Sequence, residues 1–483
     1  MFLLIGNKMK KPFKIAVSVL AVALSSNVFA DNLLDVYRLA KDGDPTFLAS
    51  EAGTLASSER VNQSMAGLLP QISASASYSK SDSESEGSSS ALLTPNDPSV
   101  PPVVVPNESA SESDTTSKSY RISLSQEIYN HATWLSLRQS EKRELQAKIN
   151  HEGSKQDLIV RAAESYFNVL AAQDSVAFSK AETEAVSKEL AQTKQRFDVG
   201  LIAITDVHEA QSRYDLAIAN QIAAQNGLDN SHELLQQITG QYHYDLLTLK
   251  EDIPLRNPDP EDIKEWVKRA ESNNISLKAS KVGMEIAKKS ISISQAGHYP
   301  TLDLSASYSD SDSDTDTPTR PAFDNAGQPI GVLSDITSNS QRSGSEVSLN
   351  LNVPIFSGGR TNSQVEEAQH LYVQASHNLE AERRRAVSLT RSSYLGTVAA
   401  VSSVKALKQA VVSAEKSLEA TQAGFEVGTR TIVDVLQQTQ ILFNSKRQYA
   451  RARYDYVLNI LRLKQATGLL TEDDLAAVNK LLR

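Results

Sequence analysis

The residues that could do chemistry are scattered through this sequence and form no catalytic pattern. Eight of its 483 residues are histidine and none is cysteine. No H-E-x-x-H, G-x-G-x-x-G or G-x-S-x-G motif occurs, and no phosphate-binding G-x-x-x-x-G-K motif is present. The densest glycine cluster, Ser357-Gly358-Gly359-Arg360, fits a turn from a strand into a helix. We therefore expect no enzyme, no cofactor and no thiolate-bound metal.

Two polar side chains stand out by their relative position. Asp434 and Gln437 lie three residues apart in a segment of helical character, so they share one helix face. If three copies of the chain met around an axis, Asp434 would form a ring of three carboxylates. Such a ring would favour cations and could bind a divalent or trivalent cation. The remaining carboxylates lie on solvated helix faces, where single charges contribute little.

The N-terminus has the pattern of a secretory signal peptide. Four lysines precede a short apolar run, residues 15–24, and small residues follow it. The run is too short for a membrane span, which needs about 20 apolar residues. We predict that residues 1–30 are removed by cleavage after Ala30, with translation starting at Met1 or Met9, and that the protein is exported.

The mature protein is acidic. The signal peptide carries four lysines and no acid, so its removal changes the net charge from −9 to −13. This balance argues against nucleic acid as a partner. Beyond the signal peptide the sequence has no continuous stretch of about 18 apolar residues. We therefore expect the mature chain either to be soluble or to enter a membrane as β-strands.

The mature sequence is duplicated. Phe197-Asp198-Val199-Gly200 returns 228 residues later as Phe425-Glu426-Val427-Gly428, and Gln237-Ile238-Thr239-Gly240 returns at the same offset as Gln465-Ala466-Thr467-Gly468. Tyr166 likewise matches Tyr394. Chance does not hold one offset over so many segments, and a fixed period is typical of repeated structural units. We predict two repeats, residues 31–256 and 257–483.

Each repeat is predicted to begin with a helix and to continue with two strands. The first helix, residues 33–66, is interrupted at Asp44-Pro45. Alternation of apolar and polar residues then indicates strands, at about 70–85, 118–130, 300–312 and 344–356. The segments 80–118 and 309–344 are rich in Ser, Asp and Glu. We predict them as solvent-exposed loops.

Very long helices are predicted to follow the strands. Residues 131–196 and 360–422 contain no proline and one glycine each, and each would extend about 95–100 Å at 1.5 Å per residue. Apolar residues near the end of the second helix have coiled-coil spacing: Val404, Leu407, Val411, Ala414, Leu418 and Phe425. Gly200 and Gly428 are expected to end the helices. Shorter helices would return, giving hairpins over 131–239 and 360–467, and a C-terminal helix would start at Glu472.

Four strands per chain cannot close a barrel alone. Open strand edges do not face lipid, because each unpaired backbone group costs several kcal/mol there, and bacterial barrels use at least eight strands. Three chains would supply twelve. Aromatic residues at the strand ends would then form the interfacial girdles of such a barrel: Tyr78, Tyr120, Tyr129, Tyr299, Tyr308 and Phe356. A small soluble sheet is the alternative.

The motifs at the two hairpin tips resemble those of the TolC family of outer-membrane efflux proteins. The resemblance covers nearly the whole mature sequence and is most specific in two segments, the one from Val427 to Leu436, VGTRTIVDVL, and its repeat partner from Gln195 to Val207. The resemblance implies a mainly α-helical protein with a membrane β-barrel. It implies a homotrimer whose twelve-stranded barrel in the outer membrane continues into a periplasmic coiled-coil tunnel.

The resemblance also implies a function. It implies a passive exit duct for tripartite efflux pumps or type I protein secretion, opened when a periplasmic adaptor (membrane fusion protein) and an inner-membrane pump or ABC exporter engage it. Its substrates would be drugs, bile-type detergents or secreted polypeptides. Asp434 and Gln437 would line the constriction of the closed tunnel. The adaptor would contact the tip residues, namely Val199, Gly200, Leu201, Val427, Gly428 and Thr429.

Latch residues follow from the same resemblance. Arg430 would pair with Thr205 and Asp206 of a neighbouring chain, since its guanidinium can hold a carboxylate by two bonds. Phe425 stands where the family often has tyrosine, so it offers no hydroxyl to Asp206. Glu189 and Gln422 stand where the family often has Gln and Glu, which preserves one donor and one acceptor. Gln437 stands where the family commonly has aspartate, so cation block should be weaker.

Two other classes of protein share some of these features. A periplasmic coiled-coil adaptor or scaffold would also be exported with helical hairpins, but it would be expected to carry one hairpin flanked by small β-domains. A trimeric surface adhesin would be expected to end in a dedicated membrane anchor, whereas this chain ends in a short helix-like segment, residues 472–483.

Overall fold

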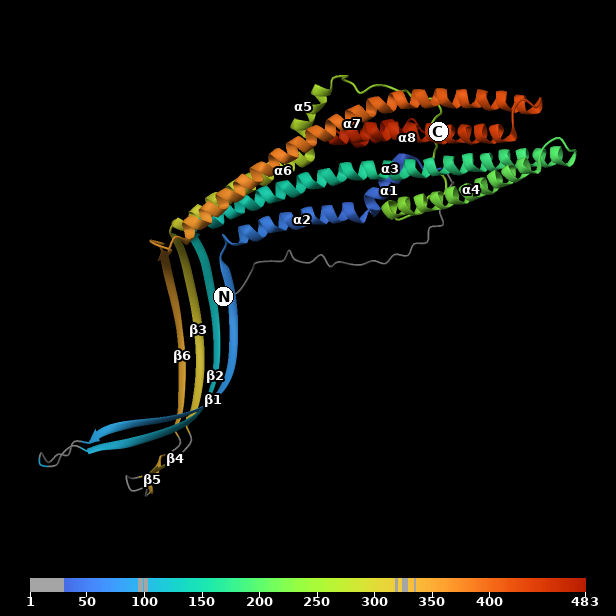
Figure 1. The fold of residues 1–483 in the computed structure, drawn as a ribbon. Helices are drawn as coiled ribbons and strands as arrows, with labels where there is room; N and C mark the ends of the chain where they lie inside the picture. Colours follow the sequence, from blue (N-terminus) through green and yellow to red (C-terminus); the bar gives the residue numbers. More distant parts are fainter. Residues whose placement is uncertain (1–29, 94–98, 100–102, 318–319, 324–328, 334–335) are drawn as a thin grey trace, which may run out of the picture.

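The computed structural model describes residues 30–93, 99, 103–317, 320–323, 329–333 and 336–483. Apart from Ala30, the predicted signal peptide lies outside the described residues. The molecule is elongated, with a long helical body that carries a β-sheet at one end, and the sheet projects at an angle from the helices (Figure 1).

The first helix is divided where proline interrupts it. α1 spans Leu33–Gly43 and α2 spans Pro45–Ala66. Asp44 caps α2 by accepting a hydrogen bond of 2.7 Å from the backbone N–H of Phe47, and it pairs with Arg161 at 2.7 Å. Pro45 suits the first turn, where its missing N–H would have no helical partner. The predicted break is confirmed.

Four strands form one antiparallel sheet in the order β1-β2-β3-β6. They are β1 Gln71–Leu93, β2 Val103–Tyr129, β3 Thr301–Thr317 and β6 Ile336–Asn352. A separate pair, β4 Arg320–Phe323 and β5 Pro329–Leu333, forms a short two-stranded sheet. Strands from the two halves of the chain therefore meet in the middle of the main sheet, where β2 pairs with β3, and β1 and β6 are its edges.

The predicted loops are wrong in extent, because the strands continue far into them. β1 runs eight residues past position 85, and β2 begins fifteen residues before position 118. β3 and β6 likewise extend into the predicted loop 309–344. The polar sequence still alternates, and cross-strand serine pairs such as Ser77–Ser119 at 2.7 Å and Ser83–Ser113 at 2.8 Å satisfy it. The backbone ladder needs no apolar residues, so polarity alone was a poor signal of a loop.

The strand register aligns apolar residues across one face of the sheet. Ile72 faces Leu124, Leu124 faces Ala306, and Ala306 faces Val347. The residues between them in sequence lie on the other face, which is rich in serine. The apolar side chains are exposed in the single chain, Ile72 at 72 % and Val347 at 74 %. One chain thus presents an uncovered apolar band.

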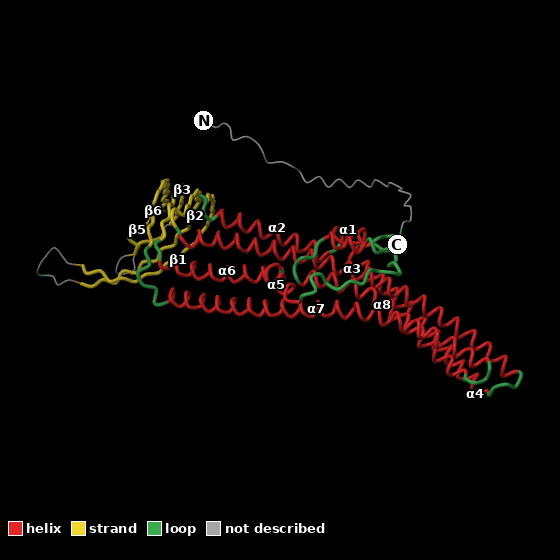
Figure 2. The backbone as a smooth tube through the Cα atoms, turned by 90° about the horizontal axis from the view of Figure 1, so that it is seen from above, coloured by secondary structure: helices red, strands yellow, loops and turns green. Residues whose placement is uncertain are grey.

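The helical body consists of two long hairpins laid side by side (Figures 1 and 2). In the first, α3 His131–Asp198 pairs with α4 Ile204–Thr239; in the second, α7 Arg360–Glu426 pairs with α8 Ile432–Ala466. α5 Ile263–Asn273 packs against α7, and α6 Ile275–Gln295 packs against both α3 and α7. A single 3-10 turn, Ala296–His298, leads into β3, and α9 Glu472–Asn479 lies near the C-terminus.

The long helix α7 contains one window of 18 residues that is apolar enough to cross a bilayer by length and composition alone. No such stretch was expected from the sequence. The helix is 67 residues long, whereas a span takes about 20, and it packs along α6 and α8. We therefore treat α7 as part of the helical body.

The main core lies where four parts of the molecule meet: the N-terminal helix α1, the C-terminal segment, the two hairpins, and the segment that follows α4. It is built around Tyr166 and Phe167, which are fully buried. The Tyr166 hydroxyl donates to the carbonyls of Asp31 and Leu247, at 3.2 and 2.7 Å. Its repeat partner Tyr394 donates to the carbonyl of Glu261 at 2.7 Å. Asp31 and Glu261 each directly precede a helix N-cap, so the two tyrosines anchor equivalent points.

Candidate functional site at the hairpin tips

The two hairpins end in turns of the same construction. The N–H of Gly200 bonds the carbonyl of Phe197 at 2.8 Å and that of Leu201 bonds Arg196 at 2.9 Å, while Gly428 and Thr429 repeat these bonds with Phe425 and Gly424. This pair of bonds is a Schellman motif, which needs a left-handed residue. Gly200 and Gly428 supply it with φ of +77° and +79°.

The turns present apolar side chains to solvent. Val199, Leu201 and Val427 are 70 %, 72 % and 75 % exposed. They lie at the end of the helical body farthest from the sheet (Figure 1). Together with Gly200, Gly428 and Thr429 they are the residues predicted to contact a partner, and in this chain nothing covers them.

Asp434 lies in the first turn of α8 and caps its own helix. Its carboxylate accepts hydrogen bonds of 3.0 Å from both the backbone N–H and the hydroxyl of Thr431, and Thr431 accepts one from the Asp434 N–H at 3.3 Å. The pKa of Asp434 is lowered below its ordinary value. The main cause is the hydrogen bond from the backbone N–H of Thr431, followed by the bond from the Thr431 hydroxyl and the nearby charge of Arg430. The group is therefore held in its anionic form. Gln437 is exposed one turn further along.

The predicted pair of Glu189 and Gln422 meets within one chain. The Gln422 amide donates to the Glu189 carboxylate at 3.2 Å, joining α3 to α7. Burial raises the pKa of Glu189, and the hydrogen bond from Gln422 opposes that rise. The swapped pair thus keeps one donor and one acceptor in contact.

The other predicted latch residues do not meet within one chain. The side chains of Arg430, Thr205 and Asp206 make no hydrogen bond or ion pair with any described residue. The stem of Arg430 lies over Gly424, where a Cβ would come within 2.8 Å of its Cγ. All three lie at the tips, in the first turn of α4 or just before α8, so a partner chain could reach them.

One tip residue was missed by the sequence analysis. The Arg196 guanidinium lies 4.3 Å from the centre of the Phe425 ring and donates to the Phe425 carbonyl at 3.2 Å. Phe425 itself is only 5 % exposed. Its ring belongs to a cluster with Val186 and Leu190 of α3 and residues of α8. Arg196 stood in the conspicuous motif, but the sequence held no signal that a helix 229 residues away would supply its partner.

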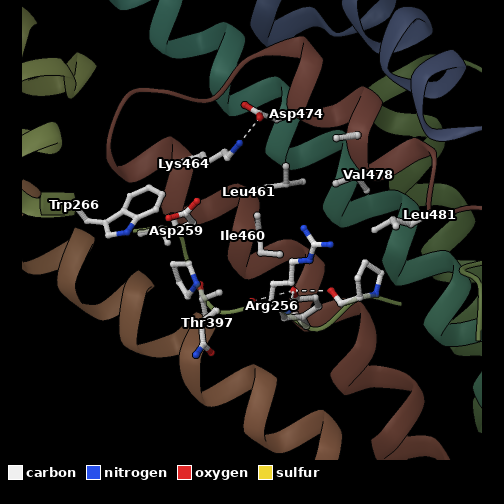
Figure 3. Close-up of a pocket in the computed structure, with 16 residues that line it drawn as sticks. Arg256, Asp259, Trp266, Thr397, Ile460, Leu461, Lys464, Asp474, Val478 and Leu481 are labelled. Carbon is white, nitrogen blue, oxygen red and sulfur yellow. Dashed lines mark hydrogen bonds and ion pairs between the residues drawn. The ribbon is translucent and has the colours of Figure 1, made fainter. Parts of the chain in front are cut away.

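Away from the tips, a pocket of about 480 Å³ lies among α8, α9 and the segment 254–259 (Figure 3). Its lining is mainly apolar, with Trp266, Ile460, Leu461 and Val478. Lys464 forms an ion pair with Asp474 at its rim, and the Trp266 indole donates to the Pro260 carbonyl at 2.8 Å. Arg256 and Asp259 also line the pocket. Within the described residues, no group of three or more His, Asp or Glu side chains could hold a metal.

Comparisons with known proteins agree with this architecture. A model of the family described as "Outer membrane efflux protein" matches residues 36–241 and 266–469. The chain belongs to this family. It is 37 % identical over 471 residues to the outer membrane protein TolC of Vibrio cholerae, covering 98 % of each chain. It is 37 % identical to TolC of Escherichia coli, covering 98 % of this chain and 90 % of that protein.

More distant relatives also match over most of the chain. The alkaline protease secretion protein AprF of Pseudomonas aeruginosa is 25 % identical over 457 residues, which cover 94 % of this chain and 88 % of that protein. Among solved structures, the Campylobacter jejuni CmeC outer membrane channel superposes with a TM-score of 0.68 at 15 % identity, covering 94 % and 90 % of the two chains. This outer membrane efflux protein is thus an outer-membrane channel component of a transport family.

Proposed function

We propose that three copies of this chain form a channel with one twelve-stranded β-barrel and a periplasmic helical tunnel. The observation that carries the proposal is the open four-stranded sheet, which has an apolar face and two unpaired edges, β1 and β6. Joining β6 of one chain to β1 of the next would pair those edges, as a membrane barrel requires. The repeats 31–256 and 257–483 would contribute two strands and one hairpin each.

The apolar face has the height that an outer membrane requires. Tyr120 and Tyr129 on β2 lie nine residues apart, roughly 30 Å along the strand. With the usual tilt of barrel strands, this matches an apolar band about 25 Å tall between two aromatic girdles. Tyr78 and Tyr308 lie near one boundary, Tyr299 and Phe356 near the other, and all are exposed in the single chain.

We infer that the channel is a passive exit duct for efflux pumps and for type I protein secretion. Support comes from the family, whose description names efflux, and from the relative AprF, whose name refers to protease secretion. A periplasmic adaptor and an inner-membrane pump or ABC exporter would engage the exposed tips and open the tunnel. Multidrug resistance would be one consequence of the efflux role. No step of this function needs catalysis.

Recording single-channel currents tests the proposal. The mature chain, purified in detergent, is expected to run as a trimer and to form small, cation-selective pores in planar bilayers. The rival function, a periplasmic adaptor or scaffold, predicts a protein that stays soluble without detergent and forms no pore. That result would overturn the channel.

A membrane position for the sheet can be tested by labelling, because the chain has no cysteine. Glu84→Cys lies beyond the tyrosine boundary of β1 and should react with a membrane-impermeant maleimide on intact cells. Ala74→Cys lies inside the apolar band and should stay unlabelled, although both side chains are exposed in one chain. Leu201→Cys at the tip should react only after the outer membrane is permeabilised. Labelling of Ala74→Cys on intact cells would contradict this placement.

A further inference from the structure

The contact between Arg196 and Phe425 joins the two hairpins of one chain. Arg196 lies in the last turn of α3, and Phe425 lies in the last turn of α7. The guanidinium makes two different contacts there, with the ring face at 4.3 Å and with the backbone carbonyl at 3.2 Å. These lie close to the tips, where the predicted gate and partner-contact residues are found.

Both contacts suit an arginine. The Phe425 carbonyl is one of the last in α7 and already accepts from the Gly428 N–H at 3.2 Å. Its second lone pair and the helix dipole leave negative charge at this end, so a cation from a neighbouring helix is stabilised there. The flat guanidinium can also lie on the face of an aromatic ring while donating sideways. Arg196 therefore caps the end of α7 from outside its own hairpin.

The duplication provides an internal comparison. Phe197 is the repeat partner of Phe425, yet Phe197 is 38 % exposed and Phe425 only 5 %. The repeat partner of Arg196 is Gly424, 228 residues later. Phe425 is thus covered by an arginine, whereas its repeat partner Phe197 is partly exposed.

Glycine at position 424 is explained by its surroundings. A Cβ there would come within 2.8 Å of the Arg430 Cγ and 3.2 Å of the Thr429 hydroxyl. Both distances are too short for ordinary packing, so a side chain at 424 would displace Arg430. At the second tip, glycine therefore stands at the position equivalent to Arg196, and the Arg430 side chain lies against it.

We propose that Arg196 is a positioning residue of the gate, which fastens α7 to α3 within each protomer while Arg430 serves the junction between protomers. This rests on the proposed function. Arg196 then closes the junction between α3 and α7 within a protomer, and Arg430 closes the junction between protomers. In place of the tyrosine hydroxyl that Phe425 lacks, the ring is held by a cation on its face.

The proposal is tested with Arg196→Gln in the full-length channel in planar bilayers. The variant is expected to raise the fraction of time spent in a high-conductance state about tenfold, the size expected for losing a cation–π contact and a charge-assisted hydrogen bond. Arg196→Lys, which keeps the charge without the flat fork, should lie between wild type and Arg196→Gln. Lys194→Gln is the matched control, since the Lys194 ammonium donates to Gln211 of its own hairpin at 3.3 Å and makes no hydrogen bond or ion pair with α7 among the described residues.

Coupling separates this role from a general loss of structure. Phe425→Leu should have the same direction of effect. The double variant Arg196→Gln with Phe425→Leu should open the channel by less than the product of the two single effects, because the ring contact is shared while the bond to the carbonyl of residue 425 is not. In the double variant Arg196→Gln with Arg430→Gln, the two effects on the fraction of time spent open should multiply, because the two arginines act at different junctions. The thermal midpoint of the detergent-purified trimer should stay unchanged in Arg196→Gln.

The outcomes distinguish the inference from the function on which it rests. If the wild type forms pores and Arg196→Gln behaves like Lys194→Gln, the role of Arg196 is wrong and the channel stands. If the effects of Arg196→Gln and Phe425→Leu multiply, the contact between them is not what closes the junction. If the wild type forms no pore, the proposed function fails first.

Discussion

Replacing Asp434 with Asn is expected to remove most of the cation selectivity of the channel while leaving its conductance near the wild-type value. The substitution deletes three negative charges from the constriction of a trimer, and we expect the preference for K⁺ over Cl⁻ to fall about tenfold. The amide oxygen can still accept from the Thr431 N–H, as the carboxylate does at 3.0 Å. The cap of α8 should therefore survive, and reversal-potential measurements would report on charge alone.

Companion variants separate the charge from the cap. Asp434→Ala removes the charge and also the carboxylate half of the capping box, while the Thr431 hydroxyl can still accept from the backbone N–H of residue 434. Any further change in conductance beyond that of Asp434→Asn therefore reports on the bonds that the side chain of residue 434 accepts. Gln437→Asp adds a second ring one turn along and should increase block by divalent and trivalent cations. Selectivity that survives Asp434→Asn would place the constriction elsewhere.

The low pKa of Asp434 bears on the same measurement. Hydrogen bonds from Thr431 favour the carboxylate over the acid. A carboxyl with a lowered pKa keeps its charge until the pH falls below its ordinary value. In the proposed ring, the carboxylates of the other two protomers would raise the pKa of Asp434 and oppose this effect, so the test compares the cation selectivity of two proteins that both keep the ring. In Thr431→Val, which removes the hydroxyl bond, the selectivity should be lost at a higher pH than in the wild type.

Most elements of the fold could be predicted because their signals are local. The break between α1 and α2 follows from Asp44-Pro45, and the ends of α3 and α7 follow from Gly200 and Gly428. The extent of the strands could not be predicted from the sequence, because serine and aspartate are typical of loops. Here these residues are held in strands by pairing with a strand that lies far away in sequence. Ser117 and Ser313, for example, meet at 3.2 Å across 196 residues.

The position of the candidate site residues at the tips could be predicted from the sequence, but their contacts could not. Motifs placed Asp434, Glu189 and Gln422 at the tips, and the structure brings the last two together at 3.2 Å. The resemblance gave no reason to expect Arg196 on Phe425, because that contact depends on how two hairpins lie beside each other. It assigned Asp434 to a gate, which stays a prediction, and gave no reason to expect the side chain in the capping box of α8, where the structure places it.

Joining positions 206 and 430 by cysteine is expected to produce covalent trimers. Neither the side chain of Asp206 nor that of Arg430 has a hydrogen-bonding or ion-pair partner among the described residues of its own chain, and both lie at the tips. In the proposed trimer they face each other across protomers. Under oxidation, Asp206→Cys with Arg430→Cys should migrate as a dimer or trimer on a denaturing gel, and its pores should stay in the low-conductance state.

The complementary variants should open the channel. Arg430→Gln removes a guanidinium that would hold a carboxylate by two charge-assisted bonds, each about twice as strong as a neutral one, so the resting conductance should rise several-fold. Asp206→Asn should do the same, and the two together should add little, because they remove one interaction. Lys188→Gln, which loses a surface pair to Glu184 within α3, is the matched control. Oxidised double-cysteine protein that remains monomeric would place the two residues apart and would leave the junction between protomers to other side chains.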